Sequence, residues 1–60
     1  MKKMTFSRIS VGVLFYLPIG QALSGLAMRK IGESTYVVDN DSASPEYTAG
    51  ADKEILAVGS

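Results

Sequence analysis

The chain has one long apolar stretch, residues 9–27, which holds no charged side chain and lies between Arg8 and the pair Arg29-Lys30. At about 1.5 Å per residue, a helix of that length is about 28 Å long. The hydrocarbon core of a bilayer is about 30 Å thick, so the match is close. The pattern therefore predicts a small membrane-type chain with one N-terminal apolar α-helix over residues 9–27, followed by a mostly irregular acidic tail.

The same stretch also fits the three-part plan of an export signal peptide. Residues 1–8 form a basic n-region, residues 9–17 an apolar h-region of the usual length, and Pro18 interrupts a helix after it. Small residues then occupy the positions that a signal peptidase requires, at Gly20 and Ala22 and again at Gly25 and Ala27. Cleavage at either site would release only a short chain without a core, so we favour a retained anchor over a cleaved precursor.

The basic residues on both sides of the apolar stretch predict its orientation. This membrane flank consists of Lys2, Lys3, Arg8, Arg29 and Lys30. The first three outweigh the last two, and the positive-inside bias then places the N-terminus in the cytoplasm and the tail outside, in the periplasm, the lumen or the exterior. Secretion of the tail is the alternative localisation.

Two features predict contact with a larger membrane protein in addition to the lipid bilayer. Gly12, Gly20 and Ser24 are spaced at multiples of four, which is typical of a helix-packing face. The tail also holds two short apolar segments flanked by acidic residues, as in a tail that folds onto a partner. The partner-binding residues expected there are Tyr36, Val37, Val38, Ile55, Leu56 and Val58.

Within the tail, only two segments have patterns of secondary structure. Residues 35–38 are four β-forming residues and predict a short strand, and residues 39–45 are turn-forming throughout. Residues 53–58 fit either a helical turn capped by Asp52 or, over residues 55–58, a second strand paired with the first. The tail is therefore expected to be mostly irregular.

Composition limits the chemistry that is open to the chain. The sequence has no cysteine and no histidine, which removes disulfides, thiolate metal sites and the commonest general base. Residues 1–27 carry three basic and no acidic residues, whereas residues 28–60 carry three basic and six acidic ones. So few basic residues do not favour nucleic-acid binding. We expect no catalytic residues, no cofactor and no metal.

Three short motifs in the second half of the chain are weaker indications of a functional site. Residues 39–42 resemble the start of a calcium loop, but Ala43, Ser44 and Gly50 stand where that loop needs an oxygen ligand, a glycine and a glutamate, so a solvated turn is favoured. Asn40 begins a triplet that accepts N-glycosylation in a eukaryotic secretory pathway. Arg29-Lys30 also fits a processing site, although a membrane flank is the simpler interpretation.

The sequence thus divides into a basic n-region (residues 1–8), an apolar helix (residues 9–27) and an extracytoplasmic acidic tail (residues 28–60). The predicted function is that of a non-enzymatic single-span membrane protein, an accessory or stabilising subunit of a larger membrane complex. The alternative is a secretory precursor that releases a short acidic peptide. A membrane-active lysis peptide ranks last, because it requires an amphipathic helix and this stretch is apolar nearly all round.

Overall fold

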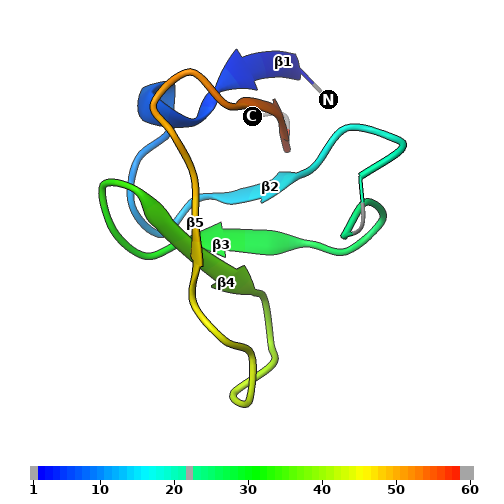
Figure 1. The fold of residues 1–60 in the computed structure, drawn as a ribbon, viewed down its shortest axis with the longest axis vertical. Coiled ribbons are helices and arrows are strands. Elements are labelled where there is room, and N and C mark those ends of the chain that lie inside the picture. Colours follow the sequence, from blue (N-terminus) through cyan, green and yellow to red (C-terminus); the bar gives the residue numbers. More distant parts are fainter. Residues whose placement is uncertain (1, 22, 59–60) are drawn as a thin grey trace.

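The structure, a computed structural model that describes residues 2–21 and 23–58, consists of short strands joined by turns (Figure 1). The strands are β1 (Lys2–Thr5), β2 (Leu14–Tyr16), β3 (Met28–Lys30), β4 (Thr35–Val38), β5 (Tyr47–Thr48) and β6 (Glu54–Ala57). One turn of 3₁₀-helix, η1 (Phe6–Arg8), follows β1. The described residues contain no α-helix.

The six strands form a single antiparallel sheet in the order β1-β6-β2-β3-β4-β5. The last strand lies between the first two: Thr5 of β1 is opposite Glu54 of β6, and Phe15 of β2 is opposite Ala57. From β2 onward, each strand pairs with the next one in the sequence, up to β5. Figure 1 shows β1 beside the C-terminal strand, so the two ends of the described chain lie close together.

Alternation along the strands places every second side chain in the core. In β6, Ile55 and Ala57 are buried while Glu54 is exposed, and in β3, Met28 and Lys30 are buried while Arg29 is exposed. Because successive side chains of a strand point to opposite faces, this pattern marks one face of the sheet as the inner one.

The inner face encloses a small core with an aromatic centre. The Phe6 and Phe15 rings meet edge to face with centroids 5.6 Å apart, and Phe15 contacts Tyr36 at 5.4 Å. The buried set is Phe6, Ile9, Phe15, Leu17, Met28, Tyr36, Ala49, Ile55 and Ala57. The radius of gyration, 10.2 Å, is close to the value of about 10 Å expected for a folded chain of this length. The chain is thus a compact all-β domain.

The predicted α-helix over residues 9–27 is wrong. The chain there makes a turn, then β2, then a series of further turns. Gly12, Gly20 and Gly25 have φ angles of 94°, 101° and 92°, in the left-handed region, which a continuous right-handed helix does not contain. The apolar run exists because Phe15, Leu17 and their neighbours fill the core of the sheet instead of facing lipid.

The membrane assignment is wrong for the same reason, because it required this helix. In the part of the chain that the structure describes, no helix has the length and apolar character that crossing a bilayer requires. The single-span accessory subunit, its cytoplasmic N-terminus and outer tail, and the bilayer and membrane complex as partners all depended on that helix, and these predictions are wrong.

The irregular tail is also a wrong prediction. Residues 28–57 contain β3, β4, β5 and β6, and residues 59–60 lie outside the described residues. The strand over residues 35–38 is confirmed as β4. It does not pair with residues 55–58, because β4 lies between β3 and β5 and β6 lies between β1 and β2. Residues 54–57 are a strand and not a helical turn.

The secretory alternative is contradicted by the same sheet. A cut after Ala22 or Ala27 would remove β1, η1 and β2, and with them Phe6 and Phe15 from the middle of the core. Whether a peptidase accepts either site is not tested by the structure, and Ala22 lies outside the described residues.

Candidate functional site

One edge of the sheet is a strand with an unpaired side. β1 pairs only with β6, so its other side faces outward in the described structure. The Phe6 amide donates to the Lys53 carbonyl over 2.8 Å, just beyond the pair Thr5 and Glu54. In an antiparallel ladder, bonded and non-bonded pairs alternate. The amides and carbonyls of Lys3 and Thr5 therefore point away from β6, toward the free side.

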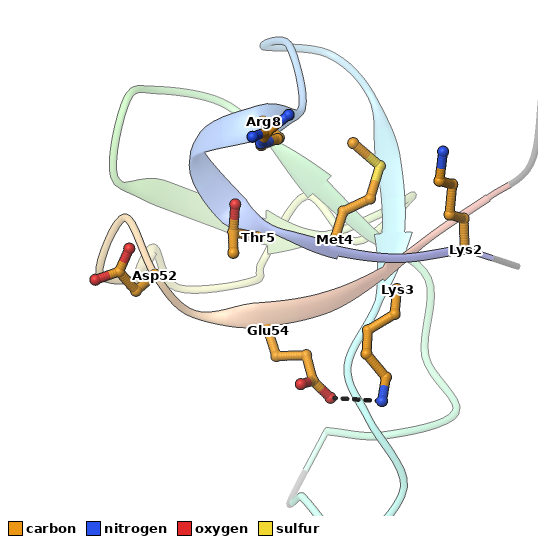
Figure 2. A pocket seen from close by; sticks show the side chains of 7 residues that line it. All are labelled: Lys2, Lys3, Met4, Thr5, Arg8, Asp52 and Glu54. Atoms are coloured by element: carbon orange, nitrogen blue, oxygen red, sulfur yellow. Dashed lines mark ion pairs between the residues drawn. The ribbon is translucent and has the colours of Figure 1, made fainter.

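β1 also lines a groove of about 410 Å³, which we call the β1 groove (Figure 2). All four residues of β1 line it, so the groove follows the strand. The complete lining is Lys2, Lys3, Met4, Thr5, Arg8, Asp52 and Glu54. The groove thus combines unpaired main-chain groups with three cationic and two acidic side chains.

The charges of the β1 groove are divided between its two sides. Figure 2 shows Lys2 and Met4 projecting to one side of β1, with Arg8 on the η1 turn toward that side, and Lys3 and Glu54 on the other; Asp52 lies beyond Thr5, on the turn before β6. Lys3 Nζ lies 3.9 Å from Glu54 Oε2, and both side chains are more than half exposed. Met4 is partly buried against the core. One side therefore presents two cations and an apolar side chain, on the other side Lys3 is balanced by Glu54, and Asp52 lies at the end of the groove nearest η1.

A buried lysine holds the turn that carries Arg8. Lys30 is 5% exposed, and its Nζ donates to the carbonyls of Phe6 (3.0 Å) and Ile9 (2.8 Å). The same ammonium group lies 4.5 Å from the centroid of the Phe6 ring. The Phe6 carbonyl also accepts from the Ile9 amide over 3.4 Å within the turn, so Lys30 adds a second donor to it and supplies a donor to the Ile9 carbonyl at the end of η1. Arg8 is thereby set beside β1 on a fixed backbone.

The aromatic centre behind this turn extends to the far edge of the sheet. The Tyr36 and Tyr47 rings stack with centroids 5.5 Å apart. Burial raises the pKa of Tyr36 above its ordinary value, and the neighbouring Tyr47 raises this pKa further. The Tyr36 phenol therefore stays protonated over the whole neutral range.

A second groove, of about 430 Å³, lies over the end of β4. It is lined by Arg29, Val37, Val38, Asp39, Asn40, Asp41 and Ser42. Its carboxylates already have partners: Asp39 accepts from Arg29 over 2.8 Å, and Asp41 accepts from the Ala43 amide over 3.0 Å. No group of three or more potential metal ligands occurs among the described residues. This groove offers a polar turn whose two carboxylates are already hydrogen-bonded within the chain, and we do not assign it a function.

The basic residues that were expected to flank a membrane separate into two groups. Lys2, Lys3 and Arg8 come together in the β1 groove. Arg29 forms its ion pair on the outer face of β3, and Lys30 is buried on the inner face. The membrane-flank prediction thus named three residues of the β1 groove, but it assigned their charges to contact with a bilayer.

The other predicted site residues are dispersed over the fold. Gly12 and Gly20 lie in turns, as does Ser24, so the helix on which they were to form a packing face is absent. Of the expected partner-binding residues, Tyr36 and Ile55 are buried in the core, and Val37, Val38 and Leu56 are partly buried. Val58 is 43% exposed. A role for these residues in binding stays a prediction.

We did not expect the remaining groove residues, Met4, Thr5, Asp52 and Glu54, from the sequence. A sign of β1 was present, because Met4 and Phe6 alternate with polar residues over residues 3–7. Nothing local places Asp52 and Glu54 beside it, since the two strands are about fifty positions apart in the chain. No protein-family model, curated protein or solved structure matches the chain.

Proposed function

We propose that this chain is a non-catalytic binding module that accepts an extended segment of a partner protein as an added strand along β1. The observation that carries the proposal is the free side of β1, with its outward amides and carbonyls, together with a groove that all four residues of the strand line. In strand addition, main-chain hydrogen bonds supply affinity and side-chain pockets supply specificity. The β1 groove contains both kinds of group.

The dimensions of β1 fit such a segment. Four residues at about 3.3 Å each give an edge of about 13 Å, enough for a short extended peptide. The exposed amides of Lys3 and Thr5 are two residues apart, which is the spacing at which an antiparallel strand offers its bonded pairs. The partly buried Met4 between them offers an apolar contact on the core side.

The absence of catalysis is part of the proposal. A nucleophile needs a base within hydrogen-bond reach and a third group that orients the base. The groove offers lysine, arginine and carboxylate side chains on an open surface, with Lys3 already paired to Glu54. This arrangement favours recognition over chemistry.

The proposal is tested by panning a random peptide library against the chain and measuring the enriched peptides by NMR. A Thr5→Pro variant provides the decisive comparison. Thr5 has an outward amide and a φ of −93°, so a small backbone adjustment toward the proline value of about −65° lets Thr5→Pro keep the ladder to β6 while blocking the free side. Thr5→Val is the matched control, because it also removes the hydroxyl that contacts Ser7 but keeps the amide.

We expect enriched peptides to shift the amide signals of Lys3 and Thr5, to bind the Thr5→Val variant and to lose binding to Thr5→Pro. A folded Thr5→Pro variant that binds the same peptides equally well would overturn the proposal, as would a library from which no peptide is enriched. Peptides with N-methylated backbones lack the amide donors of an added strand, and they should lose binding to the unmodified chain. This comparison remains decisive if the proline variant does not fold.

A further inference from the structure

The charge distribution of the β1 groove points to the class of partner segment. We infer that the groove selects an extended segment with acidic side chains at two alternate positions around an apolar one, acid-x-apolar-x-acid. This inference rests on the proposed strand addition along β1. It adds a specificity that main-chain pairing alone does not provide.

The selecting side of the groove is the one formed by Lys2, Met4 and Arg8. Figure 2 shows the two cations flanking Met4 on the same side of β1. Among the described residues, neither Lys2 nor Arg8 forms an ion pair within the chain. Both charges are therefore available to a ligand, while the charge of Lys3 on the opposite side is offset by Glu54.

The alternation of side chains along a strand determines which positions of an added segment face this side of the groove. Side chains of an added strand alternate between the two sides, so every second residue faces Lys2, Met4 and Arg8. An apolar side chain opposite Met4 places one neighbour two positions away opposite Lys2, and the other beyond the end of β1, where the η1 turn carries Arg8. The residues between them face Lys3 and Glu54, where a small polar side chain is accommodated beside an existing ion pair.

A second copy of the chain is a poorer occupant of the same edge. Pairing β1 with β1 would double a groove that already holds three cationic and only two acidic side chains. Lysines on a free edge commonly prevent this kind of self-association. The same lysines favour a partner with acidic side chains, because opposite charges facing each other across strands are stabilising.

The test compares three capped peptides that differ only in charge. The acidic probe is Gly-Glu-Thr-Val-Thr-Glu-Gly, the neutral probe has glutamine in place of glutamate, and the basic probe has lysine. Binding is followed by NMR titration of the isotope-labelled chain at low ionic strength. We expect the acidic probe to bind about tenfold more tightly than the neutral one, as two exposed ion pairs allow, and the basic probe most weakly. Added salt should reduce this preference.

Variants of the chain locate the preference. Lys2→Gln and Arg8→Gln should each reduce the preference for the acidic probe about threefold and leave the affinity of the neutral probe unchanged. Arg29→Gln is the matched control, because it removes the same formal charge from the second groove, where Arg29 is paired with Asp39. It should leave the ranking of the probes intact.

The outcomes separate the inference from the proposed function. If all three probes bind with equal affinity and all are lost in the Thr5→Pro variant, strand addition stands and the acidic preference is overturned. If no probe shifts the amides of Lys3 and Thr5, both are overturned. Concentration-dependent shifts of these amides without any peptide would identify a second copy as the occupant and overturn the inference.

Discussion

Lys30 shows how a single charged residue is accommodated in the core of a small domain. Burying an ammonium group is costly unless its donors are satisfied. Here they are used, because Nζ donates to the carbonyls of Phe6 and Ile9 and lies over the Phe6 ring. The lysine thereby ties β3 to the turn after β1, and this turn supplies one wall of the β1 groove.

We expect Lys30→Met to lower the free energy of unfolding by about 2 kcal/mol, since methionine fills the space but leaves the Ile9 carbonyl without a donor and the Phe6 carbonyl with the Ile9 amide alone. Lys53→Met is the control: Lys53 Nζ donates to Gln21 Oε1 on the surface, and its loss should cost less than about 0.5 kcal/mol. Urea denaturation followed by circular dichroism measures both values. Equal midpoints for the two variants would show that the buried ammonium contributes little.

Tyr36 makes the free energy of unfolding depend on pH in the alkaline range. Its pKa is raised in the folded state, so the folded protein holds this proton more tightly than the unfolded chain does. The resulting stabilisation is fully present below the unfolded pKa of about 10 and is lost as the pH rises through the folded pKa. Urea midpoints measured from neutral pH to about pH 11 should therefore fall more steeply for the native chain than for Tyr36→Phe. Parallel curves for the two proteins would contradict this assignment.

At the scale of elements, the apolar run over residues 9–27 shows where sequence patterns mislead. Length and hydropathy alone do not distinguish a membrane helix from a strand with apolar flanking turns. The informative residues were Gly12, Gly20 and Gly25, with Pro18 between them, which punctuate the run at intervals too short for a helix. All three glycines have positive φ in the structure. The positions of glycine and proline therefore indicated the turns, whereas the hydropathy of the whole stretch indicated a helix.

Strand pairing was less predictable than strand existence. β4 followed from four consecutive β-forming residues, because that preference is local. Its partners did not, since the register of a strand depends on which distant segment shares its buried face. The insertion of β6 between β1 and β2 joins the two ends of the chain, and nothing in either segment alone specifies it.

The candidate site was predictable to the same limited extent. Lys2, Lys3 and Arg8 are close in sequence, so their clustering is a local property that composition reveals. Asp52 and Glu54 join them only through the pairing of β1 with β6. The division of charge between the two sides of the groove therefore exists only in the folded molecule, because it combines strand alternation with a long-range register.

At the scale of the whole molecule, the core is shared between both halves of the chain. Of the nine buried apolar residues in the part of the chain that the structure describes, four precede residue 23: Phe6, Ile9, Phe15 and Leu17. A domain of this size is close to the lower limit at which a chain buries enough apolar surface to fold alone. Neither half is therefore expected to keep a core without the other.

This dependence gives the last prediction. A chain of residues 23–60, the product expected from cleavage after Ala22, should be unfolded, because it lacks β1, η1 and β2 and loses Phe6 and Phe15 from the core that also holds Met28 and Ile55. The full chain, measured under the same conditions, should show the dispersed amide spectrum of a folded sheet, whereas the shortened one should show the narrow dispersion of a disordered chain. Adding residues 1–22 as a separate peptide should restore dispersion only at high concentration, because two separate pieces lack the advantage of a covalent connection. A well-dispersed spectrum from residues 23–60 alone would contradict the shared core and reopen the interpretation of residues 1–22 as a removable segment.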